Sequence, residues 1–78
     1  DKYNLAHMFK DKMGISYYQY VIQQRLLTGK NLILEGMPAN KACFACGFND
    51  YSSFFRAFKK EYEVSPTAFR RIHEGMIG

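Results

Sequence analysis

The chain has 78 residues, with 11 Lys and Arg against 7 Asp and Glu and a net charge of +4. That length suits one small domain, and the positive charge fits a polyanionic partner as well as it fits a basic protein that binds no nucleic acid. No apolar run reaches the roughly 20 residues that cross a bilayer, no signal-peptide pattern opens the chain, and two cysteines are too few for a disulfide framework, so we expect a cytoplasmic protein without membrane contact.

The first predicted helix lies between Tyr3 and Lys12, where Leu5, Met8 and Phe9 recur at helical spacing. Gly14 suits the left-handed turn that ends a helix.

The second predicted helix has the clearest start in the sequence. Ser16 can cap it, Gln19 can complete a capping box, and Ile15 and Tyr20 hold the positions of a hydrophobic staple. The helix runs to Leu34 and stops at Gly36, and about twenty residues at 1.5 Å each give a rod of roughly 30 Å. Its expected apolar face is Tyr18, Ile22, Leu26, Gly29 and Ile33, with Leu32 beside them. A glycine inside a helix costs up to ~1 kcal/mol relative to alanine, so Gly29 indicates a close approach by another helix.

Three shorter helices are expected in the second half of the chain. Pro38 suits the first turn of a helix over 39–45, and a tight turn at 46–49 follows it. Asp50 is a good cap for a helix from Tyr51 to about Glu61. A last short helix, 67–73, follows Ser65 as cap and Pro66 at its first position. With no strand pattern, the predicted fold is all-α.

A helix, a glycine-containing turn and a second helix together form the outline of a helix-turn-helix, which many helical hairpins share. In that outline Phe54 and Phe58 anchor the second helix, while its other side is free to face a groove of DNA.

The chain reads GFNDYSSFFRAFKK over 47–60 and SPTAFR over 65–70. These two stretches resemble the signature of the AraC/XylS family of bacterial transcription regulators, G-F-x-D-x-S-x-F-x-R-x-F-K and then S/T-P-x-x-Y/F-R. Further matches to the first half of the family pattern are Leu5, Phe9, Lys10, Gly14, Ser16, Tyr20, Arg25, Leu32 and Ile33.

The resemblance implies a homeodomain-like fold with two helix-turn-helix units on one long linker helix, which places recognition helices in successive major grooves. Residues 1–14 would be the recognition helix of the first unit, 15–36 the linker helix, and 37–78 the second unit with a C-terminal helix. The family's two preceding helices are absent from the sequence, so we expect the first unit to be incomplete. Glu63 stands where the family has glycine, which puts the geometry of that turn in question.

The family's DNA-facing positions can be assigned to residues of this chain. In the first recognition helix the base-contacting positions are Tyr3, Ala6 and His7, and in the second they are Tyr51, Ser52, Phe55 and Arg56. Arg56 is the best candidate for reading guanine, because a guanidinium can bond two acceptors of that base. Lys10, although it falls on a base-facing position, suits phosphate contact better, as do Lys59 and Lys60. The core is expected to hold Leu5, Phe9, Tyr20, Leu32, Phe48, Phe54 and Phe58.

The resemblance also implies partners: double-stranded DNA, RNA polymerase, and a separate sensing or dimerising domain in the whole protein. The alternative from another functional class is a helical protein-binding module, which would use the exposed aromatic residues but would not explain Arg56, Lys59 and Lys60 on one helical face.

Other chemistry has little support in the sequence. Cys43 and Cys46 could form half of a zinc site, but the only histidines, His7 and His73, are far away in sequence, so two buried thiols are the preferred interpretation. His73 is expected to be solvated. We find no catalytic constellation, and expect no enzyme activity, metal or cofactor.

Overall fold

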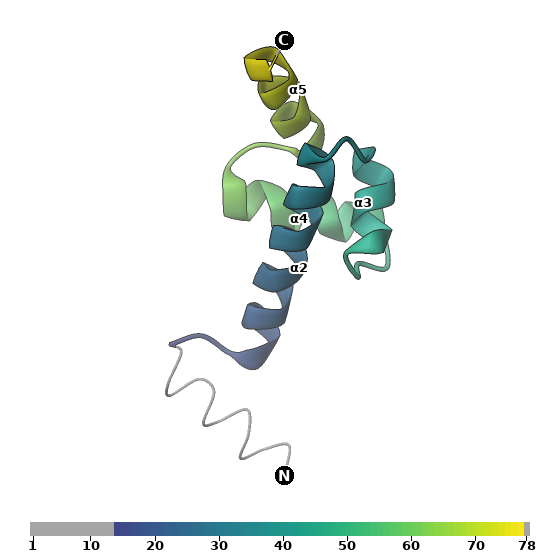
Figure 1. Ribbon diagram of the computed structural model, residues 1–78. Coiled ribbons are helices and arrows are strands. Elements are labelled where there is room, and N and C mark those ends of the chain that lie inside the picture. The colour runs from purple at the N-terminus through teal and green to yellow at the C-terminus, as the bar shows by residue number, and fades with distance from the viewer. Residues whose placement is uncertain (1–13, 78) are drawn as a thin grey trace.

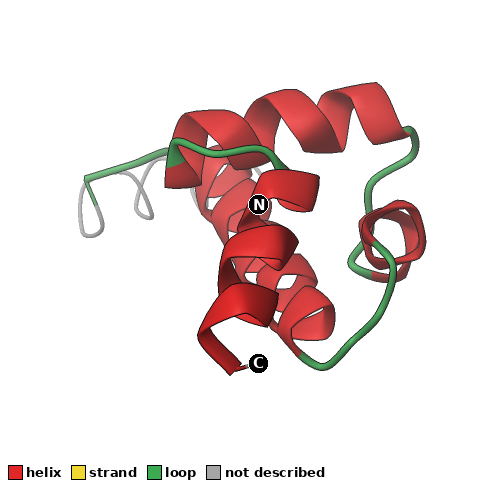
Figure 2. Ribbon diagram, turned by 90° about the horizontal axis from the view of Figure 1, so that it is seen from above, coloured by secondary structure: helices red, strands yellow, loops and turns green. Residues whose placement is uncertain are grey.

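The computed structural model describes residues 14–77, with side chains as far as Glu74. The described part consists of four helices, α2 (Tyr17–Leu34), α3 (Ala39–Ala45), α4 (Tyr51–Tyr62) and α5 (Pro66–Ile77), joined by short loops without any strand (Figures 1 and 2). The prediction of an all-α fold is confirmed. The expected helix over 3–12, with Leu5 and Phe9, lies outside the described residues.

The starts of α2, α4 and α5 follow the side-chain caps predicted from the sequence. Ser16 Oγ accepts the Gln19 N–H at 3.0 Å, and the Gln19 side chain accepts the Ser16 N–H at 3.1 Å, so the capping box is complete. Asp50 and Ser65 cap their helices in the same manner, accepting the N–H groups of Ser53 at 2.8 Å and Ala68 at 3.1 Å. These bonds satisfy amides that have no partner within the helix, so each start is fixed locally.

Pro38 occupies a different position in α3 from the one predicted: it precedes the first turn of the helix instead of belonging to it. Its ψ of 144° is not helical, and its carbonyl accepts the amides of Lys41 and Ala42 at 3.0 and 2.9 Å. Pro38 is therefore the cap residue of α3 rather than the first residue of its first turn.

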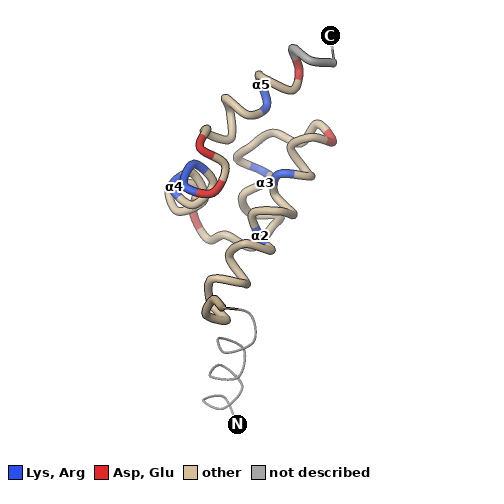
Figure 3. Tube along the Cα trace, turned by 90° about the vertical axis from the view of Figure 1, so that its left-hand side faces the viewer, with Lys and Arg blue, Asp and Glu red and all other residues tan. Residues whose placement is uncertain are grey.

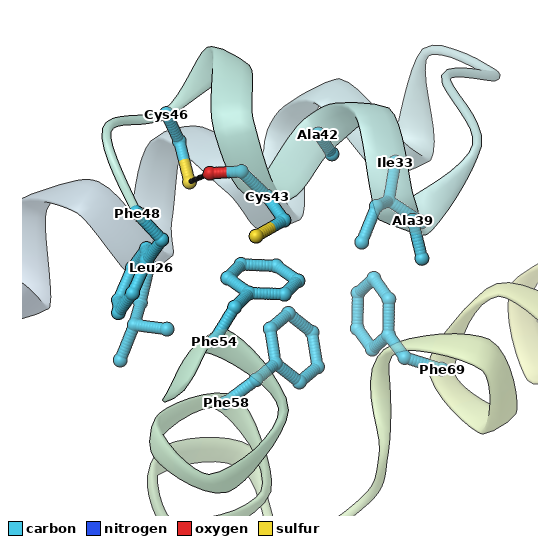
Figure 4. Close-up of a cluster of buried hydrophobic side chains, with 10 residues drawn as sticks. All are labelled: Leu26, Ile33, Ala39, Ala42, Cys43, Cys46, Phe48, Phe54, Phe58 and Phe69. Atoms are coloured by element: carbon cyan, nitrogen blue, oxygen red, sulfur yellow. Dashed lines mark hydrogen bonds between the residues drawn. The ribbon is translucent and has the colours of Figure 1, made fainter. Parts of the chain in front are cut away.

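The core forms where α3, α4 and α5 pack against α2 (Figure 4). Phe54 and Phe58 of α4 are completely buried, and Phe48 from the loop and Phe69 from α5 lie against them, with ring centroids 5.3 and 5.5 Å from Phe54 and Phe58 respectively. From α2 come Leu26 and Ile33, and from α3 come Ala42 and Cys43. The predicted burial of Phe48, Phe54 and Phe58 is confirmed, whereas Tyr20 and Leu32 are only half-buried.

Gly29 allows α2 to approach this core closely. A Cβ built on Gly29 would lie 3.0 Å from both Cys46 Sγ and Phe54 Cε1. The prediction of a close helix approach at this glycine is confirmed.

Three further predictions for single residues or helix ends are wrong. Tyr18 is 71% exposed instead of lying on the apolar face of α2, because the buried side chains of that helix begin at Leu26. α5 continues to Ile77, beyond the predicted end at His73. His73 packs on Phe69, with ring centroids 4.1 Å apart and Nδ1 2.9 Å from the Phe69 carbonyl oxygen. It is therefore held by the preceding turn of α5 rather than solvated.

Candidate nucleic-acid interface

The turn between α3 and α4 is built from residues that favour a sharp change of direction. Gly47 has φ 110°, which side-chain-bearing residues rarely adopt. A Cβ at Gly47 would also lie 2.9 Å from Arg25 Nε, so the side chain of Arg25 on α2 lies directly over the turn. The turn therefore needs glycine for two reasons: its backbone conformation and the Arg25 side chain of α2 that lies over it.

α4 leaves this turn with its first amides held by the carboxylate of Asp50. Asp50 Oδ1 accepts the Ser53 N–H at 2.8 Å, and Oδ2 accepts the Ser53 hydroxyl at 3.0 Å. These two bonds, with a smaller contribution from the charge of Arg56, lower the pKa of Asp50 from its usual value of 3.8. The carboxylate therefore remains ionised at neutral pH and complements the positive end of the α4 dipole.

α4 has two opposite faces. Phe54 and Phe58 fill the core on one, and the other carries a set of exposed polar residues that we call the basic face: Ser52, Arg56, Lys59 and Lys60. Basic residues cluster along α4 in Figure 3. No ion pair within the described residues involves the basic face, so its three positive charges are available to an external anion.

The two remaining second-helix candidates, Tyr51 and Phe55, are half-buried at the edge of the basic face. Their rings lie 6.2 Å apart, and the Tyr51 ring lies 6.1 Å from that of Phe54. Burial, with a smaller effect of Cys43, raises the pKa of Tyr51 above its usual value. Its phenol is therefore a neutral hydroxyl that can donate a hydrogen bond. The structure brings Tyr51, Ser52, Phe55 and Arg56 together on consecutive turns, while Tyr3, Ala6, His7 and Lys10 lie outside the described residues.

The two cysteines lie in the core, away from the basic face. Cys43 is completely buried and Cys46 is 8% exposed, and their thiols point to the carbonyl oxygens of Asp50 and Cys43 at 3.4 and 3.3 Å. Burial is the main cause that raises both thiol pKa values, so the thiolate needed for metal binding or redox chemistry is disfavoured. Within residues 14–77, no three His, Cys, Asp or Glu side chains are placed to hold a metal ion.

Sequence reasoning missed a group of polar residues on α5. Thr67 and Arg71 share one side of this helix, at the edge of a cleft that Tyr51 also lines. Their spacing of four residues places them on one helical face and could have revealed the pair.

No helix in the described part of the chain is long and apolar enough to span a membrane.

The chain is similar to transcription regulators over most of its length. A family model described as a helix-turn-helix domain matches residues 1–72. The probable transcriptional regulator LumQ of Photobacterium leiognathi is 42% identical over 64 residues, which cover 81% of this chain and 26% of that protein. The transcriptional activator RhrA of Rhizobium meliloti is 36% identical, covering 82% of this chain and 21% of that protein. The chain thus spans about a quarter or less of the length of these two relatives.

Similarity extends to a shorter relative and to a solved structure. The probable transcription factor PqrA of Proteus vulgaris is 34% identical, with 88% of this chain and 57% of that protein covered. A solved structure of a protein of unknown function from Listeria innocua superposes with a TM-score of 0.85 at 26% identity, covering 94% of this chain and 70% of that one.

Proposed function

Since the chain belongs to the AraC/XylS family of transcription regulators and is a sequence-specific DNA-binding domain of that family, we propose that α4 is its recognition helix and inserts the basic face into a major groove. The single observation that supports this role best is the division of α4 between a buried aromatic side and an exposed polar side. The aromatic side holds the helix against α2, α3 and α5, and the polar side carries donors of the kind that bond base edges and phosphates.

Within the basic face we assign different tasks to different side chains. Ser52 and Arg56 contact bases, Arg56 by two hydrogen bonds to guanine. Tyr51 and Phe55 contact bases from the edge of the face, where the Phe55 ring can meet a thymine methyl group. Lys59 and Lys60 contact phosphates, which attaches the helix without reading sequence. Tyr3, Ala6, His7 and Lys10 would have the corresponding tasks in the first recognition helix.

We further propose that α2 is the linker that spaces two recognition helices along one side of the duplex. Its 18 residues give a length of about 27 Å at 1.5 Å each. Successive major grooves lie about 34 Å apart. α4 packs against α2 around Gly29, and the first recognition helix would precede the start of α2, so a rod of this length has the scale needed to hold recognition helices in both grooves.

Selection of bound duplexes from random DNA, followed by affinity measurements over a range of salt concentrations, tests the DNA-reading role. We expect enrichment of a defined sequence and a linear fall of log affinity with log salt, because cationic side chains release counterions from phosphates. Enrichment of no sequence, or an affinity that does not change with salt, would overturn the proposal and favour a protein-binding module.

The whole protein is proposed to be a cytoplasmic transcription regulator with further partners. The chain covers only 26% and 21% of the regulators LumQ and RhrA, which leaves room for a sensing or dimerising domain. Among the described residues, the large exposed hydrophobic side chains lie outside α4; Phe44 on α3 and Ile72 on α5 are two of them. A protein surface such as that of RNA polymerase could therefore be contacted while α4 holds DNA.

A further inference from the structure

A cleft of about 410 Å³ opens beside the first turn of α4, between the start of α3 and one side of α5. Polar groups from all three helices line it: Asn40 from α3, Tyr51 from α4, and Thr67 and Arg71 from α5. Because Tyr51 is the first residue of α4, the cleft is continuous with the edge of the proposed recognition helix.

The cleft is suited to an anion by its side chains. Arg71 is exposed, and no ion pair or hydrogen bond engages its guanidinium among the described residues. The Thr67 hydroxyl lies 3.4 Å from that of Ser65, and the Asn40 amide is exposed at the opposite wall. A guanidinium, a hydroxyl and an amide are all groups that proteins use to hold phosphate oxygens.

A second arginine in the cleft is occupied by a neighbouring carboxylate. Arg70 Nε donates to Glu74 Oε1 at 2.9 Å, an ion pair across one helical turn, with the side chain of Arg70 35% exposed. Glu74 lines the same cleft, so its negative charge both neutralises Arg70 and repels an incoming anion. The cleft therefore has one available cation, Arg71, while the charge of the second, Arg70, is paired with Glu74.

We propose that this cleft binds one phosphate of the DNA backbone beside the groove that α4 enters, with Arg71 as the principal contact and Glu74 as a brake on its affinity. The proposal rests on the proposed function, because the phosphate is supplied by the duplex that α4 reads. A backbone phosphate is favoured over a free phosphate ion because the cleft is open and adjoins the recognition helix, with only one unpaired cation to hold a small ion in water.

The central test is Arg71→Ala in the full chain, measured by fluorescence anisotropy on a selected duplex and on an unrelated duplex from 50 to 200 mM salt. We expect affinity to fall by the same factor on both duplexes, since phosphate contacts carry no sequence information. One lost phosphate contact removes about 0.9 from the slope of log affinity against log salt, so the deficit at 50 mM should be about 3.5 times that at 200 mM.

Lys41→Ala is the matched control for charge. Lys41 is exposed on α3 next to Asn40 but does not line the cleft, and its removal changes the net charge by the same amount. We expect it to change the slope by less than half as much as Arg71→Ala. Equal changes from the two variants would show a general charge effect and overturn the assignment of Arg71.

Glu74→Gln tests the brake in the opposite direction. Removal of its charge frees Arg70 and reduces repulsion, so we expect tighter binding on both duplexes and a slope steeper by up to about 1. Unchanged or weaker binding would overturn the role of Glu74.

Inorganic phosphate at 10 mM, added at constant ionic strength, should not reduce DNA affinity, and strong competition would identify a site for free phosphate instead.

The parent chain separates this inference from the proposed function. If its own binding to DNA is absent or does not depend on salt, the proposed function fails. If it binds with a steep salt dependence and Arg71→Ala leaves both affinity and slope unchanged, only the phosphate cleft is overturned.

Discussion

Gly29 on α2 faces Phe54 on α4 so closely that a methyl group at Gly29 would lie 3.0 Å from Phe54 Cε1 and 3.3 Å from Cζ. Cys46 Sγ would lie 3.0 Å from the same methyl group, and because Phe54 is completely buried and Cys46 is 8% exposed, neither side chain can simply turn out into solvent. The contact fixes the separation of the proposed linker and the proposed recognition helix.

Gly29→Ala is therefore expected to lower the free energy of unfolding by about 1–2 kcal/mol. Overpacking of a core costs about 1–3 kcal/mol, and the better helix propensity of alanine returns at most about 1. Urea unfolding followed by circular dichroism measures the difference. Thr28→Ala, at an exposed position of the same helix, is the control and should be neutral or slightly stabilising. A gain from Gly29→Ala equal to that of the control would contradict the close contact.

Glu63→Gly should raise stability by about 1 kcal/mol. Glu63 ends α4 with φ 66°, a left-handed conformation that costs a residue with a side chain roughly 1–2 kcal/mol and costs glycine almost nothing. The greater chain entropy of glycine in the unfolded state offsets part of this gain. Glu61→Gly, within α4 and also exposed, removes the same charge but should destabilise by about 1 kcal/mol. Thermal unfolding compares the two variants, and a loss in both would argue against strain at Glu63.

Acid should weaken the start of α4 through Asp50. Because folding lowers the pKa of this carboxyl below its usual 3.8, its contribution to stability is complete above about pH 5 and is lost as pH falls through the folded-state pKa. Asp50→Asn keeps an acceptor for the Ser53 N–H, so it should retain much of the stability at pH 6 and lose less than the parent between pH 6 and pH 3. Urea midpoints at the two pH values test this. An identical acid response in parent and variant would show that the cap carboxylate does not titrate as described.

Arg56→Ala should change which DNA the chain prefers. Loss of a two-bond contact to guanine is expected to cost about 1–3 kcal/mol at one base pair and to relax the preference there. Lys59→Ala is the comparison on the same face, and should weaken all sequences equally while reducing the salt slope by about 1. Affinities for single-base variants of a selected duplex distinguish the two. An equal loss on every duplex would reassign Arg56 to phosphate contact.

The cysteines should resist alkylation in the folded protein. Cys43 and Cys46 are buried and their thiol pKa values are raised. Iodoacetamide can therefore react with them only when the structure opens locally. We expect labelling at neutral pH without denaturant to be slower than in urea by about a hundredfold. Fast labelling of either thiol in the native protein would indicate an accessible, activated cysteine and reopen the redox interpretation.

Helix starts and stops could be predicted from the sequence because they depend on bonds between residues three or four apart. Ser16, Asp50 and Ser65 each bond an amide three positions ahead, and Gly36, with φ 108°, follows the end of α2 as predicted. The end of α5 is the exception, because this helix continues through Gly75, a residue type that often ends helices, to Ile77.

Contacts between helices were less predictable, because periodicity gives the face of a helix but not how much of that face is covered. Tyr18 continues the apolar stripe of α2 but lies beyond the part that α3, α4 and α5 cover. By contrast, the basic face could be predicted, because it depends only on the spacing of Ser52, Arg56 and Lys59 along one helix. The phosphate cleft could not be foreseen, because it joins Asn40, Tyr51 and Arg71 from three helices.

The separation of the two sides of α4 has a consequence for how such a domain can diverge. Substitutions at exposed positions such as Ser52 and Arg56 usually change stability by less than about 0.5 kcal/mol, whereas changes at Phe54 or Phe58 create cavities. A descendant chain can therefore acquire a new target site by exchanging a few outward side chains, while the aromatic residues two positions away keep the same scaffold folded.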